Sequence, residues 1–236
     1  MRAIVLVKRA ADVALLQTAA ALGGETVAVA VGGEADVLPV LAGARAAGAR
    51  RLVRLWDPGL ETTDYLGVAY TLAAAIRAIG DPTAAPTVIL AGDRGRGVVG
   101  PAVAERLGLP LLGQVTSVAL DQGKLVARRR GRDVVRSYAA ALPALVCVIV
   151  DGEAPAVAAT ATASDAGEVE SWTLTKVGLS AAELSYRKHF QSKPAKGPTP
   201  RARRFDDVRA LAAQLRAEGL VDGGKLGGGK LGGAKR

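Results

Sequence analysis

The chain has 236 residues, of which half are apolar and only 3% are aromatic, so Ala, Val and Leu must supply the buried core. Its single cysteine, Cys147, excludes an intrachain disulfide and a thiolate metal cluster. The whole net charge of +9 lies in residues 185–236, which carry thirteen of the 31 Lys and Arg residues and four of the 22 Asp and Glu residues. Residues 1–184 are therefore neutral overall and poor in aromatic side chains, which argues against nucleic-acid binding.

The first residues, MRAIVLVKRAAD, have a short apolar run followed by charge and lack a small-residue cleavage site, so they do not resemble a secretory signal. The longest apolar stretch, residues 139–150, contains Pro143 and is too short to span a bilayer. We expect a cytoplasmic protein without membrane insertion.

Short β-branched runs alternate with helical patterns in the N-terminal half, which is typical of repeated βα units on a parallel sheet. Strands are predicted at residues 3–7, 26–31, 51–55 and 87–91, and helices at residues 12–22, 36–47, 63–79 and 98–107. Thr62 or Thr63 is the expected cap of the third helix. The predicted fold class is α/β, with a Rossmann-like parallel sheet of the adenine nucleotide alpha hydrolase type, added antiparallel hairpins and an extended C-terminal arm.

The alternation of strands and helices ends at Val115, because four strand-like segments follow one another from there with only turns between them. They are residues 115–120, 125–130, 134–140 and 144–150, and we predict that they form antiparallel hairpins. The first turn is Asp121-Gln122-Gly123 and the second is Gly131-Arg132-Asp133. Arg128, Arg129, Arg130 and Arg132 cluster at the second turn, where they are either solvated strand ends or contacts of a partner.

The C-terminal part divides into an arm, a helix and a tail. Residues 187–204 are rich in Pro, Lys and Arg and predict an extended arm, and an amphipathic helix follows over residues 206–218 with Asp206 as its cap. Its apolar positions, Val208, Leu211, Leu215 and the trailing Leu220, are suited to docking. We predict an α/β domain over residues 1–184, a partner-contacting arm and helix over residues 185–221, and a disordered Gly/Lys-rich tail over residues 222–236.

The glycine-rich junction GDRGRGVVG, residues 92–100, lies between a predicted strand and a predicted helix, where free backbone N–H groups favour an anion such as phosphate. Its spacing matches neither the P-loop nor the dinucleotide fingerprint, so a tight βα turn is the alternative. His189 is far in sequence from any catalytic partner, and no Asp, Glu, His or Cys cluster has metal-ligand spacing. We therefore predict a protein that is not an enzyme and holds no metal.

Several stretches together resemble the beta subunit of electron-transfer flavoproteins. These are VLVKRA at residues 5–10, the segment of residues 25–55 with its AGARAAGAR approach to a strand, residues 87–120, GKLVARR from Gly123 and LPALVCV from Leu142. The resemblance covers about residues 1–150, and the late helix is similar more loosely. Here the family's nucleotide loop is several residues shorter and carries arginines, and the long excursion after the first strand is missing.

The resemblance implies an electron-carrier subunit in a heterodimer whose alpha subunit holds the redox-active FAD. Such a dimer passes electrons from acyl-CoA-type dehydrogenases to a quinone reductase or another acceptor. It also implies a nucleotide, AMP or a second FAD, in the beta-type subunit. Carried over by position, the binding residues are Leu6, Val31, Gly92, Asp93, Arg94, Gly95, Arg96, Gly97, Val98, Val99, Gly100, Pro101 and Ala102.

Two alternatives stay open at this point. One is a stand-alone adenine-nucleotide-binding module, similar to a universal stress protein, that binds ATP at residues 92–100 and forms a homodimer. The predicted hairpins and the long basic arm argue against it. The other alternative is a structural subunit whose nucleotide pocket is empty.

Overall fold

The computed structural model describes residues 1–93, 97–150, 155–156, 160–184, 205 and 207–220. It divides into two compact units, residues 1–189 and residues 190–236. His189, the predicted arm over residues 187–204 and the tail over residues 222–236 lie outside the described residues.

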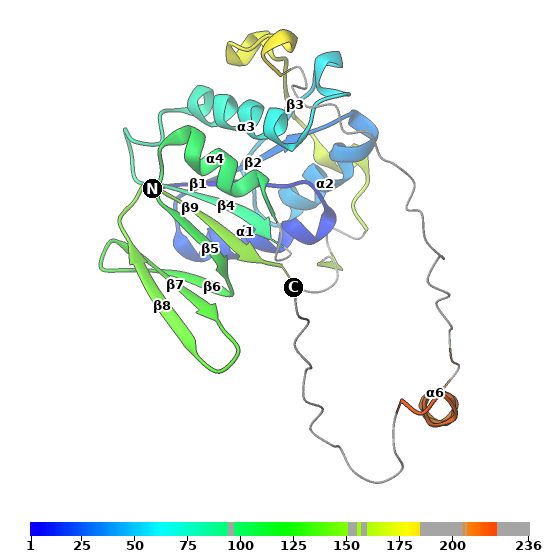
Figure 1. The fold of residues 1–236 in the computed structure, drawn as a ribbon. Coiled ribbons are helices and arrows are strands. Elements are labelled where there is room, and N and C mark those ends of the chain that lie inside the picture. The colour runs from blue at the N-terminus through cyan, green and yellow to red at the C-terminus, as the bar shows by residue number, and fades with distance from the viewer. Residues whose placement is uncertain (94–96, 151–154, 157–159, 185–204, 206, 221–236) are drawn as a thin grey trace, which may run out of the picture. The chain divides into compact units, whose positions relative to one another are not determined.

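The first unit is built on a seven-stranded sheet in the order β10-β3-β2-β1-β4-β9-β5 (Figure 1). Its strands are β1 (Arg2–Leu6), β2 (Glu25–Val31), β3 (Arg51–Leu55), β4 (Thr87–Asp93), β5 (Leu111–Val115), β9 (Ala144–Ile149) and β10 (Glu170–Trp172), and every neighbouring pair is parallel. The predicted α/β fold with a Rossmann-like parallel sheet is thereby confirmed.

Helices cover both faces of this sheet (Figure 1). On one face, α1 (Leu15–Leu22) and α2 (Glu34–Ala46) pack with Ala3 and Val5 of β1, and on the other face α3 (Tyr65–Ile79) and α4 (Val99–Leu107) pack with Ile4 and Leu6. The alternation of β1 between two cores explains its uninterrupted apolar run, since both sides of a covered parallel strand are buried. The small side chains in these layers let the helix backbones approach the sheet closely.

A separate sheet of three antiparallel strands, β6 (Ser117–Asp121), β7 (Lys124–Arg130) and β8 (Val135–Ala140), follows β5 in the order β6-β7-β8. Gln122 and Gly123 join the first two strands with φ of 46° and 76°, the positive values that a two-residue hairpin turn of type I′ requires. These three predicted hairpin strands are confirmed. Leu125 and Ala127 bury the inner face of the hairpin sheet in the core that α1 shares.

The prediction for residues 144–150 was wrong. These residues form β9, which lies in the main sheet between β4 and β5 and pairs parallel with both. Residues 144–148 are all buried, and a strand covered on both faces needs a continuous apolar sequence rather than the alternation of a half-exposed hairpin. Its apolar run indicates burial on both faces, but it does not indicate which strands β9 pairs with.

Two strands were not predicted, β5 and β10, and both lie at the edges of the main sheet. The three-residue strand β10 is held on β3 by side chains: Glu170 accepts hydrogen bonds from the Arg51 guanidinium, and Arg51 also lies over the Trp172 ring at 5.7 Å. Arg45 of α2 donates to the carbonyl oxygens of Ala166 and Glu168, at 2.7 and 2.6 Å. These long-range contacts fix the segment that approaches β10, and local sequence does not encode them.

Helix starts also differ from the predictions. Residues 10–14 form a 3₁₀ helix before α1, whereas one helix from residue 12 was expected. Asp64 rather than Thr62 or Thr63 caps α3, with its Oδ1 accepting from the N–H groups of Leu66 and Gly67 at 2.9 Å each.

In the second unit, α6 (Val208–Ala217) is capped by Asp207, which accepts from the Ala210 N–H, in place of the predicted Asp206, which lies outside the described residues. Asp207 is one residue closer to the helix, which lets its carboxylate reach the N3 amide. Among the described residues no helix is long and apolar enough to cross a membrane.

Candidate functional site

The direction in which the chain adds strands to the sheet reverses between β1 and β4. From β1 the chain builds outward through β2 and β3 on one side, and β4 begins the other side with β9 and β5 beyond it. In open α/β sheets, ligands bind in the crevice at the carboxyl ends of the strands at such a switch point. Leu6 pairs with Ala91 and with Val29, so the ends of β1, β2 and β4 meet at this edge.

A buried carboxylate closes the turn after β1. Asp12 is 3% exposed, and its Oδ2 accepts from the N–H groups of Lys8 and Arg9 at 3.0 Å each. Its Oδ1 has no hydrogen-bond partner among the described residues, although the Arg9 guanidinium lies 3.8 Å away. Asp12 therefore brings negative charge to the crevice, and Arg9 only partly balances it.

The same carboxylate explains the glycine at the end of β4. A Cβ added to Gly92 would lie 2.4 Å from Asp12 Oδ1, closer than real Cβ contacts allow. Asp12 and Gly92 are eighty positions apart in sequence and become neighbours only through the β1–β4 pairing. A side chain at position 92 would therefore displace the Asp12 carboxylate, so close packing favours glycine here.

The start of α4 offers backbone donors. The N–H groups of Val98, Val99 and Gly100 precede the first intrahelical bond of α4, which Ala102 donates to the Val98 carbonyl at 3.1 Å. No side chain caps α4 among the described residues. Val98 is 47% exposed, so this helix start faces solvent and suits an anion.

One expected donor is already engaged. The Gly97 N–H donates to Oδ1 of Asp93 at 3.0 Å, and Asp93 is only 6% exposed. Asp93 therefore holds the residue that precedes the helix start, and it places a second carboxylate beside the crevice.

The first turn of α4 packs against Cys147 of β9. A Cβ at Gly100 would meet Cys147 Sγ at 2.5 Å, so the helix approaches the sheet here as closely as glycine permits. Burial, together with the nearby charge of Asp93, raises the pKa of Cys147 to about 12. The thiol is therefore protonated at neutral pH and lies buried against the start of α4.

The structure brings most of the predicted nucleotide-binding residues to one edge. Leu6 and Val31 end β1 and β2, Gly92 and Asp93 end β4, Gly97 and Val98 precede α4, and Val99, Gly100, Pro101 and Ala102 form its first turn. Arg94, Gly95 and Arg96 lie outside the described residues. Sequence reasoning missed Asp12, for which the only local signal was an acidic residue just after the first strand.

The electron transfer flavoprotein domain family matches residues 7–177, most of the chain and all of the described switch-point edge beyond Leu6. The chain belongs to the electron transfer flavoprotein family. Curated relatives that it matches are named electron transfer flavoprotein subunit beta, in agreement with the sequence resemblance. This membership agrees with the parallel sheet and the hairpin sheet described above.

The relatives of this electron transfer flavoprotein chain are similar at modest identity. This chain is 29% identical over 160 residues to the electron transfer flavoprotein subunit beta of Mycobacterium bovis. The aligned residues cover 65% of this chain and 58% of the relative. It is 34% identical over 109 residues to Protein FixA of Azorhizobium caulinodans, covering 43% of this chain and 39% of the relative. The matched region thus spans less than two thirds of either relative.

Proposed function

We propose that this chain is the beta subunit of a heterodimeric electron-transfer flavoprotein and is an electron-carrier subunit rather than an enzyme. The observation that carries the proposal is the family match over residues 7–177, supported by relatives named as beta subunits. In this role the alpha subunit holds the FAD, which supplies the electron transfer. The heterodimer takes electrons from acyl-CoA-type dehydrogenases, delivers them to a quinone reductase or another acceptor, and works in the cytoplasm.

We further propose a nucleotide at the switch-point edge of this subunit. The amide donors of Val98, Val99 and Gly100 fit the acceptor oxygens of a phosphate, and the positive end of α4 favours its charge. The carboxylates of Asp12 and Asp93 oppose such an anion. AMP, a second FAD and an empty pocket are therefore the three states that an experiment must distinguish.

The test of the proposed function is purification of the tagged chain from its native cells. We expect a yellow complex with a flavin absorption spectrum and one co-purifying larger subunit. Extraction and chromatography of the bound nucleotides then give the ratio of AMP to FAD. A colourless preparation without a partner would refute the electron-carrier role.

A matched pair of variants tests the placement of the nucleotide. Val98→Asp puts a carboxylate at the exposed start of α4, where it repels a phosphate. Val98→Asn introduces a side chain of the same size without the charge. We expect Val98→Asp to lose the nucleotide and Val98→Asn to keep it. Equal nucleotide content in both variants would remove the site from this edge.

The second unit supplies the proposed partner contact. Val208, Leu211 and Leu215 recur at helical spacing along α6 and form one apolar stripe, which is the pattern of a helix that docks on another surface. We expect Leu211→Asp with Leu215→Asp to reduce recovery of the larger subunit. The control is Arg209→Asp with Gln214→Asp, which adds two carboxylates on other positions of α6. Equal recovery with both double variants would argue against docking through this stripe.

A further inference from the structure

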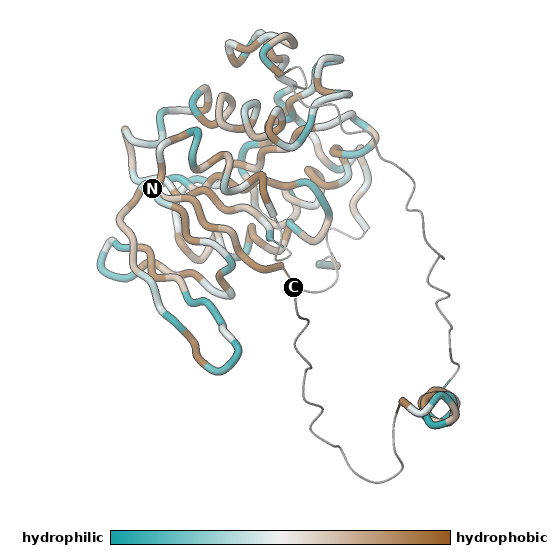
Figure 2. Tube along the Cα trace, in the orientation of Figure 1, coloured by the Kyte–Doolittle hydropathy of each residue, from teal (hydrophilic) through white to brown (hydrophobic). Residues whose placement is uncertain are grey.

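The hairpin formed by β7 and β8 has an unusually exposed outer half. Leu125 and Ala127, near its base, are buried, whereas residues 128–130 and 132–139 are all exposed. Figure 1 shows the β6-β7-β8 sheet extending away from the main sheet, and Figure 2 shows hydrophilic residues around its tip. Because a two-stranded hairpin alone is only marginally stable in water, an outer half exposed on both sides suits a surface that a partner covers.

Positive charge concentrates on this outer half. Residues 117–140 contain six Lys and Arg residues and two Asp residues, and five of the six cations are arginines between Arg128 and Arg136. Among the described residues, no carboxylate forms an ion pair with any of these five guanidiniums. Their charge is therefore not balanced within the described part of the chain.

The pairing of β7 with β8 places like charges opposite one another. Arg129 pairs directly with Arg136, so their side chains lie on the same face of the sheet, and Tyr138, paired with Ala127, shares that face. Directly opposed like charges destabilise a sheet, and an anion between them removes this penalty. Arg129 donates a hydrogen bond to Gln114, but no carboxylate of the described residues forms an ion pair with Arg129 or Arg136.

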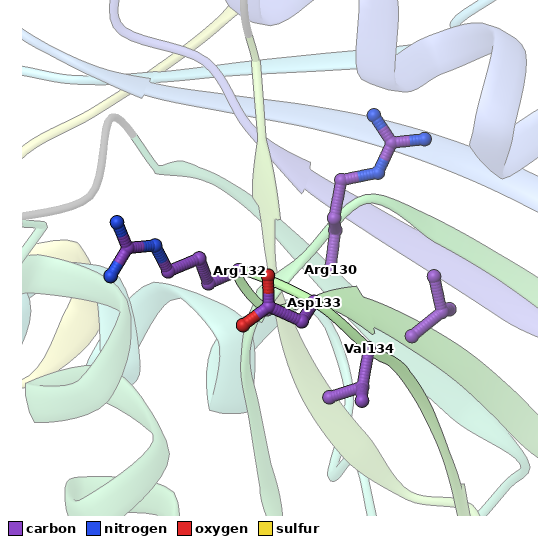
Figure 3. Close-up of a pocket in the computed structure, with 6 residues that line it drawn as sticks. Arg130, Arg132, Asp133 and Val134 are labelled. Atoms are coloured by element: carbon purple, nitrogen blue, oxygen red, sulfur yellow. The ribbon is translucent and has the colours of Figure 1, made fainter. Parts of the chain in front are cut away.

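The opposite face and the tip carry further arginines. Arg128 and Arg130 pair with Ser137 and Val135 on the other face. At the tip, a shallow hollow is lined by residues 130–135, and Figure 3 shows Arg130 and Arg132 extending in different directions from it. Cationic groups are thus presented on both faces of one narrow strand pair.

The outer edge of β8 is open for a further strand. β8 ends the order β6-β7-β8, and the bond from the Gly131 N–H to the Val134 carbonyl, at 2.8 Å, sets the phase of the ladder between β7 and β8. In that phase the N–H and C=O groups of Val135, Ser137 and Ala139 point away from β7. Backbone groups in this position can pair with an added strand.

The positive charge of the hairpin determines which kind of strand can pair with the open edge of β8. A second copy of the chain would bring its own hairpin arginines close to these, so pairing between two copies is opposed by repulsion. Single-stranded nucleic acid is bound by aromatic stacking as well as by charge, and Tyr138 is the one aromatic residue in residues 117–140. An extended protein segment with carboxylates on alternate residues fits both the open edge and the arginines.

We propose that the hairpin of residues 124–140 binds an acidic protein partner, whose extended carboxylate-rich segment adds as a strand to the open edge of β8. The carboxylates on alternate residues of that segment all lie on one face of the sheet, where they bind Arg129 and Arg136. This surface consists of other residues than the switch-point edge and α6, so it adds a contact beyond the proposed function.

The test is fluorescence anisotropy on the full chain with a labelled peptide of alternating glutamate and valine. Arg136→Glu should weaken binding by about tenfold, a loss of about 1.4 kcal/mol. Arg50→Glu makes the same charge change at an exposed arginine outside the hairpin and should alter binding by less than about twofold. Arg136→Gln is the second variant if Arg136→Glu unfolds, as judged by circular dichroism.

A separate variant tests the open edge of β8. Ser137→Pro removes an N–H that points away from β7, a position where an edge strand tolerates proline, and should also weaken peptide binding about tenfold. Equal weakening by Arg50→Glu, unchanged binding by Ser137→Pro, or equal binding of a lysine-valine peptide would overturn the proposal. Tighter binding of single-stranded oligothymidine would assign the surface to nucleic acid instead. Flavin content of the purified complex reports separately on the proposed function.

Discussion

Gly100 of α4 lies directly against Cys147 of β9, so closely that a Cβ on the glycine would meet the sulfur at 2.5 Å. Ala91 Cβ is the next neighbour, at 3.3 Å. This contact fixes how deeply the start of α4 sits on the sheet, and it therefore positions the amides proposed to hold a phosphate. It also means that a change at Gly100 disturbs packing before it tests binding.

Gly100→Ala should destabilise the protein through this contact. We expect a loss of about 1–3 kcal/mol in the free energy of unfolding, because the overpacking outweighs the helix propensity gained from alanine. In the double variant with Cys147→Ala, the added methyl group gains the space that the sulfur vacates. The loss in the double variant should therefore be at least about 0.5 kcal/mol smaller than the sum of the losses in the two single variants. Urea unfolding of the four proteins measures this coupling, and strict additivity would contradict the contact.

Alkaline pH should destabilise the protein through Cys147. The folded pKa is raised from 9.0 to about 12, so the folded state retains a proton that the unfolded state releases. The associated stability is complete below about pH 9 and is lost as the pH rises toward 12. Between pH 8 and pH 10, the wild-type protein should lose about 1–2 kcal/mol more than Cys147→Ala. Parallel pH profiles for the two proteins would refute the buried, protonated thiol.

Asp12 should be a structural requirement of the switch-point edge. Asp12→Ala leaves the Lys8 and Arg9 N–H groups without their acceptor, and we expect a loss of about 1–3 kcal/mol. Asp36→Ala, an acidic-to-alanine change in the first turn of α2, is the comparison and should cost less than about 1 kcal/mol. Thermal and urea unfolding measure both, and a cost for Asp12→Ala no larger than for Asp36→Ala would contradict this role.

The cap of α3 gives a sharp comparison between neighbouring residues. Asp64→Ala should cost about 1 kcal/mol because its Oδ1 accepts two backbone N–H groups. Thr62→Ala, at an exposed residue that sequence alone favoured as a cap, should change stability by less than about 0.5 kcal/mol. Chemical unfolding distinguishes the two, and the reverse order would assign the cap to the threonine.

The Arg51–Glu170 contact should make the attachment of β10 sensitive to acid. Hydrogen bonding to Arg51 lowers the pKa of Glu170, so this stabilisation is present above the ordinary carboxyl value of 4.5 and is lost as the pH falls below it. Because both side chains are about one third exposed, we expect no more than about 1 kcal/mol. Glu170→Gln should flatten the acid limb of the stability profile, whereas Glu168→Gln should leave it unchanged. Identical acid limbs in all three proteins would exclude the contact as a source of stability.

Several parts of the molecule could be predicted from local sequence because they depend on nearby residues. The alternation of β-branched runs and helical patterns indicated the βα units, and Gln122-Gly123 indicated a hairpin turn, since both signals come from backbone preferences and periodicity. The glycine-rich junction after β4 indicated where a candidate site lies, because parallel strands bring their carboxyl ends to one edge. Resemblance added the family, which these local patterns do not identify.

What the sequence by itself determined was therefore the α/β fold class, most of its elements and the position of the candidate site. Tertiary structure alone decided that residues 144–149 enter the main sheet, because a buried apolar strand can pair in either direction and only its neighbours choose. It also decided that Asp12 meets Gly92 and that Gly100 meets Cys147, since these partners are distant in sequence and their contact depends on strand order. Local preference acts over a few residues, whereas close packing joins residues that only the completed sheet brings together.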